Sequence, residues 1–304
     1  MEHLQDFLNH AGALNYSNST LNSYRINLSR FIKWLNTRDI FVPERIHNDH
    51  LYEWLQHLAA HRTSQGLPLR PSSVNKNIEN TRQFIKYLIK RGCLYQQLLD
   101  TLEYVKEPDM LPTSVLTHAQ VKKLVSRIKT DTSCGYRDRV MIELLYSSGV
   151  RVGELLGLDV PHVNIKDKTA IVTGKGSKQR MVPIGRTALR YIETYLIAIR
   201  PFFLRNKKEQ ALFLNQEGNR MGYLCFLRSI HKYARKAKLD TTVTPHTFRR
   251  SCTTELLRSG ANMYHVKELL GHKNLNTLRH YAKLTINDLK KTHAKCHPRE
   301  KDKE

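Results

Sequence analysis

The sequence predicts a mainly α-helical protein with a small antiparallel β-sheet, divided into a helical N-terminal domain and a larger α+β domain. Three observations lead to this prediction. Apolar residues recur at helical spacing over most of the chain, two short β-prone runs flank a glycine-containing turn at 169–184, and a proline-containing segment without helical period interrupts the pattern at 105–117. The length of 304 residues is consistent with two domains.

The N-terminal domain, residues 1–107, is expected to form a compact four-helix unit. One helix covers about 18–35 and is opened by the candidate N-caps at 18–20. A second helix covers about 49–58, and another runs from 71 to about 92, where a glycine ends it.

A linker is predicted at 108–116, followed by an α+β domain at 117–285 and a C-terminal tail at 286–304. Thr117 and Gln120 form a capping box that opens the first helix of this domain. Further helices are expected at about 136–147 and 152–157, and over most of the chain after the β-prone runs.

The two β-prone runs, Ala170–Thr173 and Arg180–Ile184, predict a hairpin around a short polar loop with two glycines. Its spacing lacks the G-x-x-x-x-G-K-[ST] pattern of a nucleotide P-loop. Lys175, Lys178 and Arg180 lie on or beside the hairpin, either as an anion-binding group or as an ordinary solvated turn.

The net charge of +23 favours a polyanionic partner, because each neutralised phosphate releases condensed counterions. Residues 1–112 hold 13 of the 50 Lys and Arg and 11 of the 27 Asp and Glu, whereas residues 113–304 hold the remaining 37 and 16. The second part therefore carries the main anion-binding surface.

Nucleic acid is favoured over an anionic membrane, because no stretch approaches the ~20 apolar residues of a spanning helix. The N-terminus does not resemble a signal peptide, and five scattered cysteines suit free thiols in a reducing cytoplasm.

Thr244 and Pro245 predict a helix start in which His246 and Arg249 project together from the first turn. A helix N-terminus favours anions, and an imidazole beside a guanidinium suits one phosphate. An isolated H-x-x-R pair is a weak signal, and most such pairs are incidental surface residues.

The next helix is expected to begin near Asn262 and to end at Gly271, which places His272 in the loop just beyond it. Asn276 or Thr277 caps one more short helix, which carries Tyr281. A lone tyrosine here would ordinarily be a core or surface residue, so its interpretation depends on the residues around it.

Four segments in order and spacing resemble the motifs of tyrosine recombinases, the family that includes phage integrases and the recombinases that resolve bacterial chromosome dimers. They are SSGVRVGELLGL (147–158), TGKGSKQRMVPIG (173–185), PHTFRRSCTTELLRSGA (245–261) and VKELLGHKNLNTLRHY (266–281). The resemblance covers roughly 113–285, and the helical first part resembles the core-binding domain of the same family. It implies an N-terminal core-binding domain and a tyrosine-recombinase catalytic domain.

By matching position, the resemblance implies a catalytic set of Arg151, Lys175, His246, Arg249, His272 and Tyr281. Tyr281 would be the nucleophile that forms a 3′-phosphotyrosine, and Lys175 the proton donor to the 5′ oxygen. His246 would accept the proton of the tyrosine, and Arg151 and Arg249, helped by His272, would stabilise the phosphate charge.

The implied activity is site-specific cutting and rejoining of double-stranded DNA without ATP, metal or other cofactor. The implied assembly is a homotetramer or heterotetramer on two sites, with the 286–304 tail docking on a neighbouring protomer. Because DNA is the implied substrate, we expect a cytoplasmic, nucleoid-associated protein that is not bound to a membrane. The gene would belong to a mobile element or to its host. The residue after Arg249 is Arg250 where the family often has histidine, and Thr277 is followed by Leu278 where two threonines are common.

Two other functions stay open at this point. A type IB topoisomerase uses similar chemistry but relaxes DNA without exchanging partners, and a non-enzymatic basic DNA-binding protein would explain the charge without the ordered set. A zinc site at His293, Cys296 and His297 has only three candidate ligands in a polar tail.

Overall fold

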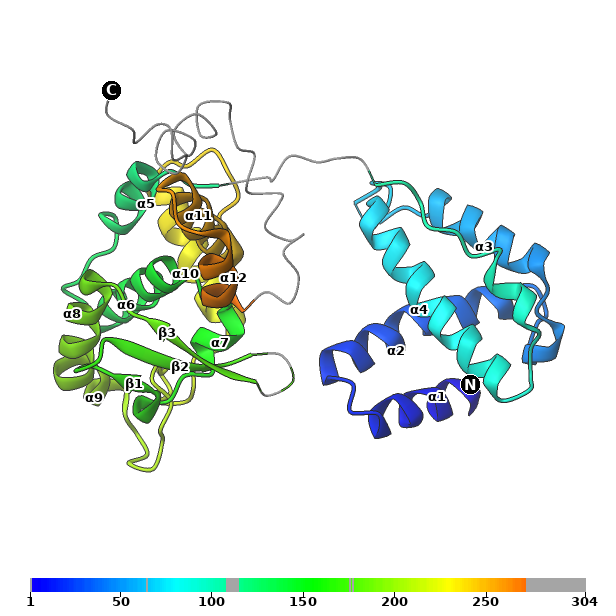
Figure 1. Cartoon of the computed structure of the whole chain (residues 1–304), viewed down its shortest axis with the longest axis horizontal. Helices are drawn as coiled ribbons and strands as arrows, with labels where there is room; N and C mark the ends of the chain where they lie inside the picture. The colour runs from blue at the N-terminus through cyan, green and yellow to red at the C-terminus, as the bar shows by residue number, and fades with distance from the viewer. Residues whose placement is uncertain (1, 64, 108–114, 175, 177, 272–304) are drawn as a thin grey trace, which may run out of the picture. The chain divides into compact units, whose positions relative to one another are not determined.

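The computed structural model describes residues 2–63, 65–107, 115–174, 176 and 178–271, and divides into two compact units, Met1–Asp109 and Met110–Glu304 (Figure 1). The predicted fold class is confirmed, because both units are built mainly from α-helices and the second contains a small antiparallel sheet. Lys175, His272, Tyr281, most of the predicted linker and the whole predicted tail lie outside the described residues.

The first unit contains four α-helices, as predicted. They are α1 (Glu2–Ala13), α2 (Asn18–Asn36), α3 (Asn48–Ala60) and α4 (Pro71–Lys90), with 3-10 turns η1 (Pro43–Arg45) and η2 (Gln96–Leu99). The predicted N-caps at 18–20 were wrong by one position. Ser17 is the N-cap, because its backbone is extended while Asn18 is already helical, and its hydroxyl accepts a hydrogen bond from the Thr20 amide at 3.3 Å.

The chain that leaves the first unit is fastened to α4. Arg82 donates hydrogen bonds to the carbonyls of Leu99 (2.7 Å) and Leu102 (2.6 Å), and Asn75 binds the main chain of Val105 through both its amide nitrogen and its oxygen. The first unit therefore extends beyond its last helix.

The second unit consists of helices packed around α6, together with one sheet (Figure 1). Its α-helices are α5 (His118–Val125), α6 (Ser133–Ser148), α7 (Val152–Leu156), α8 (Arg186–Thr194), α9 (Arg200–Phe203), α10 (Tyr223–Lys236), α11 (Pro245–Arg258) and α12 (Met263–Leu270). A 3-10 turn η3 (Val160–His162) and a π-helical turn η4 (Tyr195–Ile199) complete it.

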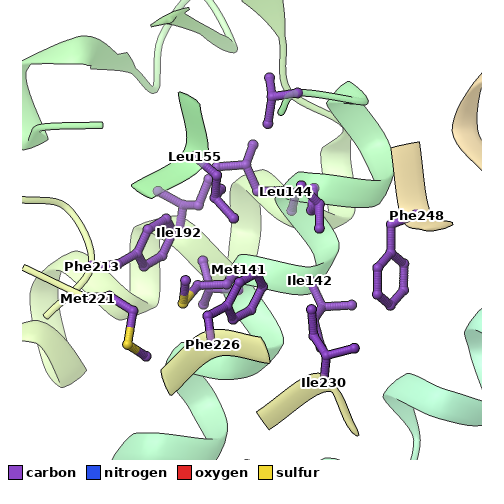
Figure 2. Close-up of a cluster of buried hydrophobic side chains, with 14 of the residues drawn as sticks. Met141, Ile142, Leu144, Leu155, Ile192, Phe213, Met221, Phe226, Ile230 and Phe248 are labelled. Carbon is purple, nitrogen blue, oxygen red and sulfur yellow. The ribbon is translucent and has the colours of Figure 1, made fainter. Parts of the chain in front are cut away.

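Helix α6 is the centre of the hydrophobic core. Its apolar side chains are buried on several sides rather than along one stripe, since Met141, Ile142 and Leu144 are all nearly inaccessible to water (Figure 2). Side chains from α7, α8, α10 and α11 pack around it, and Phe248 brings α11 into this core. The core thereby fixes the carboxyl end of α6 and the start of α11, the two places that carry the predicted arginines.

The sheet is antiparallel and has the order β1 (Val163–Asn164), β2 (Thr169–Thr173), β3 (Gln179–Pro183). Strands β2 and β3 form the predicted hairpin, with Ile171 opposite Met181 and Val172 opposite Arg180. The two-residue strand β1 was not predicted, because it is too short to show an alternating pattern. None of the described helices combines the length and apolar character that crossing a membrane requires.

Candidate active site

The site begins where α6 ends. Gly149 has φ +62° and closes the helix in the left-handed conformation. A β-carbon at this position would come within 2.8 Å of Leu270 Cδ2 and 3.2 Å of Cys252 Sγ. Glycine is therefore required here for the ends of α6 and α12 to approach closely beside α11.

Arg151 follows this turn and is the N-cap residue of α7. Glu154, three residues later, accepts hydrogen bonds from both the Arg151 amide and the Arg151 Nη1, each at 2.8 Å. The same carboxylate thus holds the main chain and the side chain of one arginine. The Arg151 side chain stays 43% exposed, so it retains a surface for an anion from solution.

Arg249 is held between two helix ends. Thr244 caps α11 and Pro245 is its first residue, as predicted, which places Arg249 one turn into the helix. Its Nη1 donates to the Gly149 carbonyl at 2.6 Å, and its Nη2 donates to the Leu270 carbonyl at 2.8 Å. The guanidinium is almost wholly buried, and two helix carboxyl ends offset the cost of burying its charge.

His246 lies in the first turn of α11 and remains partly exposed. Loss of hydration on burial is the largest cause that lowers the pKa of His246. The positive charges of Arg250, Arg249 and Arg151 lower it further. An imidazole with a lowered pKa is neutral near pH 7, the form in which it can accept a proton.

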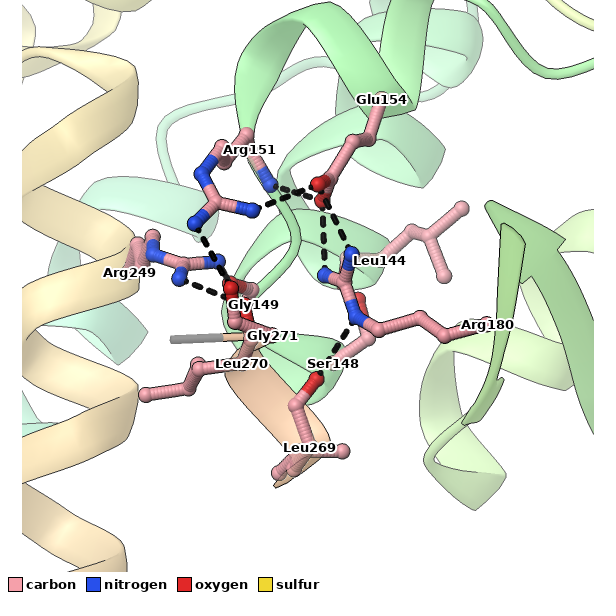
Figure 3. A network of polar contacts seen from close by, with 10 residues as sticks. All are labelled: Leu144, Ser148, Gly149, Arg151, Glu154, Arg180, Arg249, Leu269, Leu270 and Gly271. Carbon is pink, nitrogen blue, oxygen red and sulfur yellow. Dashed lines mark hydrogen bonds and ion pairs between the residues drawn. The ribbon is translucent and has the colours of Figure 1, made fainter. Parts of the chain in front are cut away.

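The carboxyl end of α12 collects three arginines from distant parts of the sequence (Figure 3). The last two carbonyls of α12 and that of its C-cap residue each receive one hydrogen bond: Leu269 from Arg180 Nε (3.1 Å), Leu270 from Arg249 Nη2 (2.8 Å) and Gly271 from Arg151 Nη2 (3.1 Å). Cations are favoured at this end of a helix. Arg151 and Arg249 therefore meet directly before position 272.

Glu154 and Arg180 form an ion pair, and neither residue was among those predicted for the site. Nη1 and Nη2 of Arg180 each donate to one oxygen of the Glu154 carboxylate at 2.8 Å (Figure 3). Burial acts to raise the pKa of Glu154, but the hydrogen bonds from Arg180 and Arg151 outweigh it and lower the pKa to about 2. The sequence did contain a signal for this pair. Glu154 stands within an apolar run, where a glutamate is buried only if a cation pairs with it.

Of the six predicted catalytic residues, the structure brings Arg151, His246 and Arg249 together. Lys175, His272 and Tyr281 lie outside the described residues, although the glycines directly before two of them touch this cluster. A β-carbon at Gly174 would lie 3.3 Å from Glu154 Oε1, and Gly271 accepts from Arg151. Within the described part of the chain, no three His, Cys, Asp or Glu side chains form a group that could hold a metal ion.

Comparison with known proteins agrees with this arrangement. The profile of the phage integrase family matches residues 114–287, and that of the phage integrase N-terminal SAM-like domain matches residues 2–93. The chain belongs to the phage integrase family.

Other members of the phage integrase family match nearly the whole chain. Tyrosine recombinase XerD of Staphylococcus epidermidis strain ATCC 35984 is 33% identical over 290 residues, covering 93% of this chain and 94% of the relative. Tyrosine recombinase XerD of Pseudomonas aeruginosa PAO1 is 34% identical over 283 residues, covering 93% and 92%. The predicted function class is confirmed: this member of the family is a tyrosine-type site-specific recombinase.

Solved structures show the same fold. The XerH site-specific recombinase bound to a palindromic difH substrate is 22% identical, with a TM-score of 0.74 over 92% of this chain and 80% of that one. A lambda integrase dimer bound to a COC′ core site is 16% identical, with a TM-score of 0.70 over 100% and 98%. The predicted pairing of a helical N-terminal domain with an α+β catalytic domain is confirmed by these likenesses.

Proposed function

We propose that this recombinase cuts and rejoins double-stranded DNA through a transient covalent link between Tyr281 and a 3′ phosphate. The observation that carries the proposal is the convergence of Arg151 and Arg249 on the last carbonyls of α12, just ahead of His272 and Tyr281 in the chain. Guanidinium groups suit this task because their planar donors match phosphate oxygens and keep their charge at any physiological pH.

In the proposed reaction the Tyr281 oxygen attacks phosphorus while the bond to the 5′ oxygen breaks. A phenol with a pKa of ~10 must lose its proton as it attacks, and the neutral imidazole of His246 accepts it. Arg151 and Arg249, with His272, stabilise the charge on the non-bridging oxygens. Lys175 gives a proton to the departing 5′ oxygen, which leaves as a hydroxyl.

The products of this step are a 3′-phosphotyrosine and a free 5′ hydroxyl. One phosphoester bond replaces another, so the reverse attack by a 5′ hydroxyl rejoins DNA without ATP. Because the proposed set already supplies the proton transfers and the charge stabilisation, the mechanism requires no metal ion.

DNA is the proposed partner of both units. The net charge of +23 supports it, and 37 of the 50 basic residues lie in 113–304, the part that contains the candidate site. Such a protein would be cytoplasmic and associated with the nucleoid.

We also propose that four protomers assemble on two recombination sites, as copies of this chain or together with a related recombinase. Residues 286–304 would dock on the neighbouring protomer, so that the position of Tyr281 depends on the presence of that neighbour. Relaxation by a type IB topoisomerase needs no such partner, so the requirement for two DNA sites distinguishes these two activities.

The test is capture of the covalent intermediate. DNA ends attached to the purified protein are mapped first, and a nicked suicide substrate is then built on that sequence. Wild-type protein should give a protein–DNA adduct on a denaturing gel, whereas Tyr281→Phe should bind the DNA and give none. Tyr264→Phe is the matched control, because Tyr264 is an exposed tyrosine on α12 and should leave the adduct intact. An adduct formed by Tyr281→Phe would overturn the proposed nucleophile, and strand exchange between two labelled sites would separate recombination from relaxation.

A further inference from the structure

Arg180 joins three segments that are distant in sequence. It lies on β3, two residues after Lys178 and close to the hairpin turn, with only 17% of its side chain exposed. All three of its guanidinium nitrogens donate to protein acceptors: Nη1 and Nη2 to the Glu154 carboxylate on α7, and Nε to the Leu269 carbonyl on α12. Its donors are thus directed into the protein, in contrast to the half-exposed Arg151.

The Glu154 carboxylate, which accepts both hydrogen bonds from Arg180, also accepts a hydrogen bond from the Arg151 side chain. Glu154 is buried, and its only ion-pair partners among the described residues are Arg151 and Arg180. A bidentate pair fixes the plane of a carboxylate as well as its position. The orientation of the Arg151 guanidinium is therefore set, through Glu154, by a residue of the hairpin.

The ion pair of Glu154 and Arg180 fits between Gly174 and Gly271 because neither glycine has a side chain. A β-carbon at Gly271 would lie 3.1 Å from Arg180 Cζ, and one at Gly174 would lie 3.3 Å from Glu154 Oε1 and 3.6 Å from Arg180 Nη1. Gly271 also has φ +62°, which disfavours any other residue. The backbone before positions 175 and 272 is therefore packed directly against the ion pair.

We propose that Arg180 is a positioning residue for DNA cleavage, which acts through Glu154 to hold Arg151 in the orientation that receives the phosphate. The inference rests on the proposed function. Arg180 itself does not touch the DNA, and its effect is confined to the step in which Arg151 stabilises charge on the non-bridging oxygens. Replacement of Arg180 should therefore resemble a milder replacement of Arg151, and should differ from replacement of Lys175.

DNA substrates with altered phosphates distinguish a defect that acts through Arg151 from one that acts through Lys175. A methylphosphonate carries no charge on its non-bridging oxygen and has little need of Arg151, whereas a 5′-bridging sulfur leaves without a proton and has little need of Lys175. Adduct formation by Arg180→Gln is measured on normal, methylphosphonate and 5′-thiolate DNA. Arg151→Ala and Lys175→Ala serve as references, and unfolding temperatures are recorded for every variant.

We expect Arg180→Gln to slow cleavage of normal DNA by about 10²-fold, the size of loss that a misplaced catalytic group produces. On methylphosphonate DNA most of that loss should disappear, as for Arg151→Ala, and on 5′-thiolate DNA it should remain. Arg180→Lys should recover part of the rate, and adding Glu154→Gln to Arg180→Gln should cause little further loss, because both act on Arg151 by one route.

The control for a purely structural role is Arg200→Gln. Arg200 also joins two segments through main-chain carbonyls, those of Glu209 (2.7 Å) and Ala211 (3.0 Å). Among the described residues, its hydrogen bonds go to these carbonyls and not to Glu154 or the arginines beside it. Arg200→Gln should lower the unfolding temperature and change adduct formation by the same factor on all three DNA substrates. If Arg180→Gln loses the same factor on all three DNAs, or is rescued by the 5′ sulfur, the inference is overturned. Failure of the wild-type protein to form any adduct would instead overturn the proposed function, and this inference with it.

Discussion

Nη2 of Arg249 donates a 2.8 Å hydrogen bond to the carbonyl of Leu270, the last residue of α12. The other terminal nitrogen binds the carbonyl of Gly149 at the end of α6. One buried guanidinium therefore fixes the distance between two helix ends, and Arg151 and His272 each come two residues after the carbonyl that it binds. We therefore expect the proposed catalytic geometry and the local stability to depend on the same side chain.

Arg249→Ala should consequently lose activity and stability together. Removing one preorganised charge stabiliser costs about 10²–10³-fold in rate. Two buried carbonyls would also lose their partner, which destabilises the unit by about 2 kcal/mol. Adduct yield on a suicide substrate and thermal unfolding measure the two effects. Arg258→Ala on the same helix is the control, since its ion pair with Glu255 spans 3.7 Å and is mostly exposed. Full activity in Arg249→Ala would contradict the proposed role.

Glu154→Gln should alter stability in a pH-dependent way. The pKa of Glu154 is about 2 in the folded protein and 4.5 in the unfolded chain, so its ionised form stabilises the fold above pH 4.5. That contribution is lost as pH falls from 4.5 towards 2. The lowered pKa corresponds to about 3 kcal/mol of stability at pH 7.

Urea unfolding at several pH values tests this expectation. The difference in unfolding free energy between wild type and Glu154→Gln should be constant from pH 7 to 5 and shrink below 4.5. Glu53→Gln provides the comparison, because Glu53 pairs with Arg38 at the surface of the first unit and should show little difference at any pH. A difference that grows on acidification would show that Glu154 is not held ionised by the two arginines.

His246 should give cleavage an acid limb below pH 6.5. In the proposed reaction its neutral form accepts the proton of the tyrosine. Loss of hydration on burial lowers the pKa of His246, and the charges of three arginines lower it further. Cleavage should therefore decline only when pH falls through this lowered pKa. Arg250→Gln removes the charge with the largest effect of the three, which raises the pKa of His246 and moves the limb to higher pH.

Single-turnover adduct formation from pH 5 to 8 measures the limb, and the proton resonances of the imidazole measure the pKa directly. His246→Gln should lose the limb together with most of the rate. If Arg250→Gln leaves the limb where it was, another group controls the proton transfer.

The helices and the hairpin could be predicted from sequence because each depends on local signals. Thr244, Pro245 and Gly271 mark helix ends wherever they occur, and the glycines at 174 and 176 mark a turn. The resemblance of four segments to the motifs of tyrosine recombinases then indicated Arg151, His246 and Arg249 by matching position, and the structure places these three residues together.

The ion pair of Glu154 with Arg180 could not be predicted in the same way. It joins residues 26 positions apart, and its partners are selected by the tertiary packing of α7 against the hairpin. The hydrogen bonds from three arginines to the end of α12 are likewise invisible in the sequence, because main-chain carbonyls carry no sequence signal. Side-chain chemistry was readable from the chain, whereas the main-chain acceptors that orient it were not.

The last prediction concerns the C-terminal residues 285–304, TINDLKKTHAKCHPREKDKE. Ile286 and Leu289 are spaced to lie on one side of a helix, with Ala294 as a further small apolar residue, and the rest is polar. One short stripe of this kind buries too little apolar surface to hold a helix in place alone, but it can be covered by a second protomer. Truncation after Lys283 should therefore preserve binding to one DNA site and abolish strand exchange between two. Gel shift with a single site and recombination of two labelled sites measure the paired effects. Ile286→Ser together with Leu289→Ser should reproduce the loss, whereas removal of only 299–304 should not. Normal recombination by the protein ending at Lys283 would exclude a docking role for the tail.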